Sequence, residues 1–356
     1  MTIYLLNIFL LFLEAIIIAK NKKWRRGKAV FVFLASLQWI LISGLRHITV
    51  GGRDVYYSYN FSFARSINTS WGDALDRFIN ILFYGAEGKD PGYLFVEKAI
   101  GIFTDNYQVF LFVIALLFIV PFGVFIYRNS KDVLMSFLIY STLFYSFFSL
   151  TGFRQAIATS LVVLIGYELI KKKKLIWFVV VSLVAFTIHK SSIVFFPFYF
   201  MADKKITTKY LIFMGGLGLI ILMAGKALYA PLAIWLEYDN MLDNDIGGTG
   251  TFTLMLSMVA IAGVIQHKPM QKNNPQSAHF INASILAMLL GLLTLQSQSF
   301  MRVQQYFSLF IVLLVPEFIR TFLPKEQVLI YMISVGTLLM LFIRNNPSYI
   351  FFWQGG

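Results

Sequence analysis

The chain has 356 residues, of which 58% are hydrophobic and only 13% are charged, and its net charge is +13. Soluble domains carry roughly 25% charged residues, so this composition excludes a soluble globular protein and predicts an integral membrane protein. We attribute the positive charge to lysines and arginines in loops and not to nucleic-acid binding. The absence of cysteine excludes disulfides, thiolate metal ligands and a cysteine nucleophile.

Apolar runs recur along the whole chain, and most are close to the length that crosses roughly 30 Å of hydrocarbon as a helix. The sequence therefore predicts an all-α polytopic membrane protein with about 12 transmembrane helices (roughly 11 to 13), forming a single membrane domain over residues 1–356. The first run has no preceding basic region, which favours a retained span over a signal peptide. The predicted spans are 2–19, 28–45, 107–127, 133–150, 155–170, 175–188, 191–202, 210–225, 251–266, 279–296, 303–319 and 327–343.

Basic loops predict the orientation of these spans. If the first basic loop, 20–28, is cytoplasmic, strict alternation also places the basic loops 127–132, 171–174, 202–209, 267–274 and 320–327 inside, and both termini outside. The stretch 175–202 could be one tilted helix or two short spans that meet at His189. We expect two, because a single helix would export three basic loops further along the chain.

Two segments outside the spans are longer than turns. Residues 46–106 form a long extracytoplasmic segment, in which Ser70 and Asp73 resemble a helix N-cap followed by apolar residues at helical spacing. This pattern predicts an amphipathic interfacial helix over 70–84. Residues 226–250 contain four acidic side chains and end in "GGTG", which predicts a mobile acidic loop on the outer side.

Charged residues gather at the outer ends of the predicted spans. They are Arg46, Arg53, Asp54, Arg154, His189, Lys190, Arg302 and Arg344. Charges at membrane depth are costly and usually face a cavity or a charged ligand, although Lys190 and Arg344 could instead reach the interface as isolated side chains. Because guanidinium groups bind phosphate in a bidentate manner, several arginines around one cavity favour an anionic, lipid-linked substrate.

Aromatic residues follow the first basic cluster, and the common catalytic motifs are absent. Tyr56 and Tyr57 could stack on sugar rings or belong to the aromatic belt of the interface. The chain has no GxSxG, HExxH or P-loop motif. Asp243-Asn244-Asp245 resembles a DxD motif, but the predicted topology puts it on the side without nucleotide sugars. We therefore expect no metal and no cofactor.

Four motifs occur in the order "GLRHITVGGRDVYYSY", "DPGYLFVEKAI", "TGFRQAIA" and "IHKSS". With them the chain resembles the EpsG family of bacterial membrane proteins, which is akin to Wzy-type polysaccharide polymerases. The resemblance implies polymerisation of capsule, exopolysaccharide or O-antigen repeat units carried on undecaprenyl pyrophosphate, with the active site on the outer face of the bacterial cytoplasmic membrane. The implied partners are that lipid-linked oligosaccharide and the bilayer, with a chain-length regulator and a flippase as further candidates.

Such a transfer needs a base for the attacking sugar hydroxyl and cations for the departing pyrophosphate. The candidate bases are, in order, Asp54, His189 and Glu97, although Asp54 could instead pair with an arginine and His189 could simply end a helix. The predicted substrate-binding residues are Arg46, Arg154 and Arg302, then Arg53 and Lys190, together with Tyr56, Tyr57, Gln155 and Gln305.

Three other functions fit parts of this pattern. A lipid-linked oligosaccharide flippase would need cations through the depth of its bundle, whereas the charges within the predicted spans are acidic: Glu14, Glu168 and Glu317. An O-antigen ligase shares the donor and the arginines, so only the family resemblance separates it from a polymerase. A scaffold of the export machinery would not need arginines gathered at one mouth.

Overall fold

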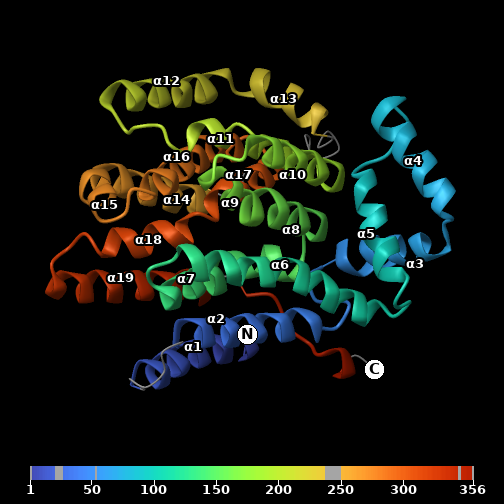
Figure 1. Cartoon of the computed structure of the whole chain (residues 1–356), viewed down its shortest axis with the longest axis horizontal. Coiled ribbons are helices and arrows are strands. Elements are labelled where there is room, and N and C mark those ends of the chain that lie inside the picture. Colours follow the sequence, from blue (N-terminus) through green and yellow to red (C-terminus); the bar gives the residue numbers. More distant parts are fainter. Residues whose placement is uncertain (1, 21–26, 53, 237–249, 344–345, 355–356) are drawn as a thin grey trace. The chain divides into compact units, whose positions relative to one another are not determined.

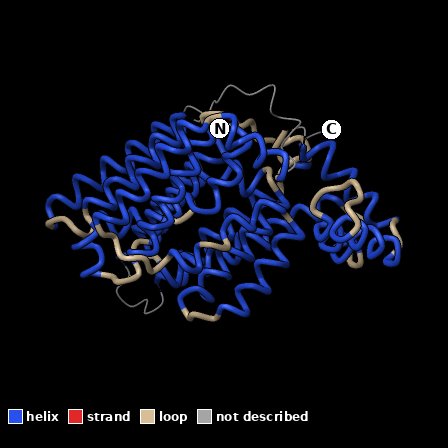
Figure 2. Tube along the Cα trace, turned by 90° about the horizontal axis from the view of Figure 1, so that it is seen from above, coloured by secondary structure: helices blue, strands red, loops and turns tan. Residues whose placement is uncertain are grey.

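Helices account for all the regular structure in the part of the chain that is described. The computed structural model describes residues 2–20, 27–52, 54–236, 250–343 and 346–354. Within these ranges the only β-type pairing is an isolated bridge between Arg46 and Phe351 (Figure 2). A helix satisfies its backbone hydrogen bonds within one segment, as hydrocarbon requires, so the predicted all-α fold is confirmed.

The chain divides into two compact units. The first unit comprises residues 1–168, 180–190 and 332–356, and the second comprises 169–179 and 191–331. Both contain apolar helices, and each is described by itself below. The expectation of a single membrane domain stays a prediction.

The first unit contains the N-terminal helices and, between α2 and α6, three short helices (Figure 1). Its elements are α1 (Thr2–Lys20), α2 (Gly27–Gly44), the π-helix η1 (Asp54–Tyr59), α3 (Asn60–Asn68), α4 (Trp71–Phe83), α5 (Pro91–Gly101), α6 (Tyr107–Asn129), α7 (Val133–Ile139), the π-helices η2 (Tyr140–Phe144) and η3 (Ser146–Leu150), α8 (Phe153–Thr159), the π-helix η4 (Ser160–Ile165), the first half of α9 (Gly166–Lys171), most of α10 (Leu175–Ile188), the end of α19 (Pro324–Ile343), and the 3₁₀-helix η8 (Phe352–Gln354).

Aromatic packing joins the outer helices of the first unit to its spans. Phe63 of α3 stacks on Phe110 of α6 with ring centroids 4.3 Å apart, and Phe153 of α8 belongs to the same buried cluster. The Lys98 ammonium of α5 donates to the carbonyls of Ser66 and Thr69, which lie at the end of α3. These contacts fix α3 and α5 against α6 and α8.

The second unit is built around α16, which packs on α12, α14, α17 and α18. Its elements are the 3₁₀-helix η5 (Lys190–Phe195, its first residue in the first unit), α11 (Phe198–Met201), α12 (Thr208–Ala224), α13 (Lys226–Trp235), α14 (Gly250–Ile265), α15 (His267–Asn273), α16 (Ser277–Thr294), the 3₁₀-helix η7 (Gln298–Phe300), α17 (Met301–Ser308) and α18 (Ile311–Ile319).

The helices support a polytopic membrane protein, but not the predicted number of spans. Among the described residues, five helical runs are long and apolar enough to cross a membrane: α2, α6, Phe153–Lys171, α16 and α19. Two bent pairs, α14 with α15 and Gln298–Ser308 with α18, raise the number to seven. The shorter apolar helices Thr2–Ile18, Val133–Phe144, α10 and α12 coincide with other predicted spans. About twelve transmembrane helices are therefore not confirmed.

The chain reverses direction after α10, which disfavours one long helix over 175–202. Helix α10 ends at Ile188 and a 3₁₀ turn follows. Phe178, near the start of α10, contacts Phe195 and Tyr199 with ring centroids 6.5 and 5.5 Å away. Lys173 before α10 also pairs with Asp203 after α11. The two ends of this stretch therefore lie together, as expected for two antiparallel segments.

The two long outer segments can be compared with their expectations only in part. Helix α4 lies where the interfacial helix was predicted, and the Ser70 hydroxyl accepts from the Asp73 backbone N–H at 3.0 Å, so the predicted cap is confirmed. Its position on a membrane surface stays a prediction. In 226–250, residues Lys226–Trp235 are helical, whereas the acidic residues, including Asp243 and Asp245, lie outside the described residues.

Candidate functional site

A polar pocket of about 480 Å³ lies in the first unit among α3, α4, α5 and the start of α8. We call it the basic pocket. It brings four cationic side chains, Arg65, Arg77, Lys89 and Arg154, together with two carboxylic acids, Asp90 and Glu97. The remaining lining residues are Ser58, Phe61, Ser62, Ser66, Thr69, Pro91, Tyr93 and Leu94. Neither α4 nor α5 is long and apolar enough to span a membrane.

Asp90 connects three elements around this pocket through hydrogen bonds. It precedes Pro91 at the start of α5 and adopts a left-handed backbone conformation with φ of 51°, which aspartate tolerates better than most residues. Its Oδ1 accepts from the Lys190 backbone N–H at 2.9 Å, and its Oδ2 accepts from Arg154 Nη1 at 3.1 Å. His189 Nδ1 also lies 3.1 Å from Oδ2. One carboxylate therefore joins α5, α8 and the end of α10.

The charge of Asp90 follows from these partners. Burial by itself raises the pKa of Asp90, but the hydrogen bond from His189, the positive charges of His189 and Arg154, and the Lys190 N–H outweigh burial and hold the pKa below its usual value. An ionised carboxylate can only accept, so His189 donates through Nδ1. His189 Nε2 is buried without a hydrogen-bond partner among the described residues.

Arg154 is held between a carboxylate and two aromatic rings. It is the second residue of α8, after Gly152, whose φ of 49° allows the sharp entry into the helix. Its guanidinium carbon lies 5.6 Å from the ring centroid of Tyr59 and 5.7 Å from that of Tyr93. The side chain is 30% exposed. Arg154 is thus positioned by three partners and still reaches the pocket.

Glu97 is the buried acid of the pocket. It is only 1% exposed, Oε2 accepts from the Ser62 hydroxyl at 2.8 Å, and Oε1 has no hydrogen-bond partner in the described part of the chain. Burial raises the pKa of Glu97 to about 7, although the Ser62 hydrogen bond and the charges of Arg154 and Arg77 oppose the shift. Such a group can take up and release a proton near neutral pH.

The other three cations surround the opening of the pocket. Arg65 comes from α3, Arg77 from α4 and Lys89 from the loop before α5, and all three are exposed. These three side chains are exposed, whereas the Arg154 guanidinium is held by Asp90 and two aromatic rings. The pocket therefore combines a preorganised guanidinium with exposed charges, an arrangement that suits an anion.

Arg46 lies elsewhere and is engaged by the protein backbone. It is 1% exposed, donates to the carbonyls of Ser43 and Leu150, and lies over the Phe153 ring at 5.3 Å. Burial lowers the pKa of Arg46 to about 10, so the side chain stays charged at neutral pH. The structure does not bring Arg46 into the basic pocket; its contacts tie α2 to the chain before α8.

The other described residues that were predicted for the site in the first unit do not line the pocket. Tyr56 and Tyr57 are 39% and 53% exposed on η1 and do not line the pocket. Gln155 is buried beside Arg154 on α8, and Lys190 contributes its backbone N–H to Asp90. Asp54 begins η1, and Arg53 lies outside the described residues, so their predicted roles stay predictions.

Arg302 and Gln305 belong to α17 in the second unit, and Arg344 lies outside the described residues. Gln305 is fully buried, and its Oε1 accepts from Ser308 at 3.3 Å. Their proposed contact with substrate stays a prediction.

The sequence analysis missed Asp90, Arg65, Arg77 and Lys89 as site residues. Asp90 stands in the quoted motif "DPGYLFVEKAI", but it resembled an ordinary helix cap before proline. Arg65 and Arg77 lie on the polar faces of short helices, where charges are usual. Residues 46–106 hold about as many acidic as basic residues, so composition gave no signal for this site.

Comparison with known proteins identifies the family of this chain. The model of the EpsG family matches residues 29–354, which is nearly the whole chain and includes every residue of the basic pocket. No curated protein and no solved structure matches the chain. The chain therefore belongs to the EpsG family, a family of Wzy-type polysaccharide polymerases.

Proposed function

We propose that this protein polymerises lipid-linked repeat units in the basic pocket, on the outer face of the bacterial cytoplasmic membrane. The growing glycan passes from undecaprenyl pyrophosphate to a hydroxyl of the next lipid-linked unit. One observation carries the proposal: a single pocket combines four cationic side chains with Glu97, a buried acid whose pKa is raised to about 7. Capsule, exopolysaccharide and O-antigen are the candidate products.

Arg154 binds the pyrophosphate of the donor in this proposal. Negative charge grows on the departing pyrophosphate during transfer, so a cation already in place stabilises the transition state more than the ground state. The contacts with Asp90, Tyr59 and Tyr93 support this role because they fix the guanidinium before substrate arrives. Arg65, Arg77 and Lys89 supply further charge at the opening.

Glu97 is the proposed general base. The acceptor oxygen forms a bond to the anomeric carbon, the bond from that carbon to the pyrophosphate oxygen breaks with its electron pair, and the hydroxyl proton moves to Glu97. The unpaired Oε1 supports this assignment over His189, since Glu97 lines the pocket and His189 does not. Asp90 and His189 then act as positioning residues for Arg154.

The direct test is polymerisation by the purified protein. Lipid-linked oligosaccharide is extracted from source cells that lack this protein and is incubated with it without added metal or nucleotide sugar. We expect a ladder of multiples of the repeat unit on a gel. A single band that never extends would overturn the proposal and would favour a flippase or a ligase, which transport in vesicles and transfer to lipid A core would then separate.

Arg154 variants test the role of the pocket in the same assay. Substitution Arg154→Lys keeps the charge but loses the planar fork, and we expect both Arg154→Lys and Arg154→Ala to abolish the ladder. Arg128→Ala is the matched control, because Arg128 is exposed and pairs with Glu168 at 3.8 Å, outside the pocket. A normal ladder from Arg154→Ala would count against the proposed phosphate contact.

A further inference from the structure

An apolar groove of about 740 Å³ shares three helices with the basic pocket within the first unit. Its lining comes from α4, α5, α6, the segment from α8 into η4, and the end of α10. Representative residues are Phe78, Ala99, Val109, Leu117, Ile157 and Ile188. Its volume falls in the usual range of small-molecule sites, roughly 300–1,000 Å³. We call it the apolar groove.

The groove and the basic pocket share three helices. On α4, Arg77 lines the pocket and its neighbour Phe78 lines the groove. On α8, Arg154 lines the pocket and Ile157, one turn later, lines the groove. On α5, the residues of the two sites occupy opposite faces of the helix. The cationic site and the apolar site therefore share α4, α5 and α8 and lie on either side of α5.

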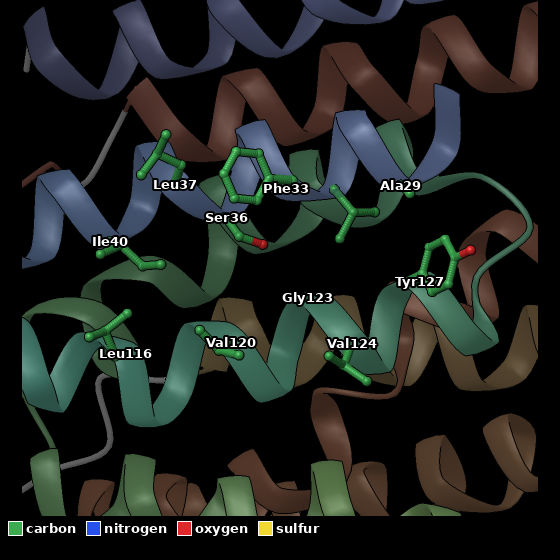
Figure 3. Close-up of a pocket in the computed structure, with 11 residues that line it drawn as sticks. Ala29, Phe33, Ser36, Leu37, Ile40, Leu116, Val120, Gly123, Val124 and Tyr127 are labelled. Carbon is green, nitrogen blue, oxygen red and sulfur yellow. The ribbon is translucent and has the colours of Figure 1, made fainter. Parts of the chain in front are cut away.

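A second groove in the same unit shows what distinguishes this one. The groove between α2 and α6 has a volume of about 460 Å³, and Figure 3 shows Ser36 and Leu37 on one wall with Val120 and Val124 on the other. No charged side chain lines either groove within the described residues, so the difference lies in the helices that form them. It lies wholly between two candidate spans, whereas the apolar groove also extends to α4 and α5, which are not spans. Bilayer lipid alone can fill the α2–α6 groove.

We propose that the apolar groove binds the polyprenyl chain of the lipid-linked substrate whose pyrophosphate lies in the basic pocket. The inference rests on the proposed function and adds the site of the lipid chain. Charge complementarity identifies the occupant: an amphiphile with an anionic head and a long apolar chain, which passes α5, fits the two sites, and the cations of the pocket select the anionic head. Chain binding would anchor the carrier while its pyrophosphate leaves the sugar.

The test compares three probes that need no knowledge of the sugars: undecaprenyl pyrophosphate, geranyl pyrophosphate and inorganic pyrophosphate. Dissociation constants are measured on the full chain in lipid nanodiscs. We expect the wild type to bind the undecaprenyl compound at least tenfold more tightly than the geranyl compound. The long chain also partitions into the lipid of the nanodisc, but this contribution is the same for every variant. It therefore cancels when the dissociation constants of two variants are compared.

Two valines on α6 form a matched pair of variants. Val109 lines the apolar groove and is 43% exposed, and Val120 lines the α2–α6 groove and is 47% exposed. We expect Val109→Phe to fill the groove and to lower the preference for the undecaprenyl over the geranyl compound at least tenfold. Binding of inorganic pyrophosphate should be unchanged. Val120→Phe should leave all three constants unchanged. Ala99→Phe, which fills the groove from α5, should repeat the effect of Val109→Phe.

The outcomes separate this inference from the proposed function. An unchanged preference for the undecaprenyl compound in both Val109→Phe and Ala99→Phe, or an equal loss in Val120→Phe, would overturn the proposed role of the groove. Ordinary bilayer lipid would then be its occupant. If the groove variants lose the preference but no protein, including the wild type, binds inorganic pyrophosphate, the result would support chain binding in the groove and count against pyrophosphate binding in the basic pocket. Loss of preference with pyrophosphate binding retained would support both.

Discussion

Two carboxylic acids in one pocket are driven to opposite states by their contacts. Asp90 accepts from three donors, and its pKa is held below the usual range in spite of burial. Glu97 is buried with a single hydrogen bond, from Ser62, and its pKa is raised to about 7. Acid and base assignments often follow such a separation. At neutral pH Asp90 is a fixed anion, and Glu97 can exchange a proton.

The proposed base predicts a pH profile. Only the ionised carboxylate of Glu97 accepts a proton, so turnover should rise as the pH increases through about 7. Glu97→Gln should lower turnover roughly 10²- to 10⁴-fold and remove this limb of the profile. Glu87→Gln is the control, since Glu87 is exposed in the same segment and does not line the pocket. A profile that keeps its rise in Glu97→Gln would rule out Glu97 as the base.

The same pKa predicts a pH dependence of stability. The unfolded value for Glu97 is 4.5 and the folded value is about 7, so between these values the folded state binds more protons than the unfolded state. The free energy of unfolding should therefore fall as the pH rises from 4.5, with the loss complete above about 7. Thermal midpoints across this range should fall less steeply in Glu97→Gln than in the wild type. Equal slopes of thermal midpoint against pH in the two proteins would contradict the raised pKa of Glu97 in the folded state.

Asp90 should matter for stability as well as for turnover. Asp90→Asn keeps the shape but leaves Arg154 without its anion, and breaking a buried pair costs about 3 kcal/mol. We expect a clearly lower thermal midpoint, whereas Asp76→Asn on the exposed face of α4 should leave it unchanged. Equal midpoints for both variants would show that Asp90 is not a structural link among α5, α8 and α10.

Several apolar helices could be predicted from the sequence, whereas the number of spans was not confirmed and the contacts of the site could not be predicted. The sequence predicted α10 with the bounds that the structure has, and α2, α6, α12, α14 and α16 within about two residues, because continuous apolar runs report helices directly. Asp90 depends instead on Arg154 and His189, which lie 64 and 99 positions away in the chain. No local pattern encodes those contacts, so Glu97 was the last choice for the base and Asp90 was not chosen.

The close approach of α5 and α10 predicts that neither helix tolerates a larger residue at their contact. A Cβ atom at Gly92 would meet Thr187, including its backbone carbonyl carbon at 2.8 Å. Gly92→Ala should therefore force the two helices apart, lower stability by about 1–3 kcal/mol and displace Asp90 from His189. Thr187→Ala alone should be mild, and combining it with Gly92→Ala should not rescue the loss, because the backbone contact remains. Full rescue by the double variant would contradict this packing.

Contacts within the first unit agree with the predicted alternation of spans. Lys28 donates to the Ser130 carbonyl at 2.7 Å, so the two loops that were predicted to be cytoplasmic meet at one end of the unit. At the opposite ends of α2 and α6, Gln108 donates to the carbonyls of Gly44 and Arg46. The basic pocket lies beyond this second end. The positive-inside rule predicts that this end faces outward.

Because the chain contains no cysteine, single introduced cysteines can test that orientation without a background signal. A membrane-impermeant maleimide should label Glu87→Cys, next to the basic pocket, in intact spheroplasts. It should label Lys131→Cys and Lys172→Cys only after the membrane is opened, because both positions lie in exposed basic loops predicted inside. The reverse pattern would place the pocket in the cytoplasm, where exported repeat units are not found, and would overturn polymerisation at this site. Labelling of all three in intact cells would instead contradict strict alternation between Glu87 and Lys172.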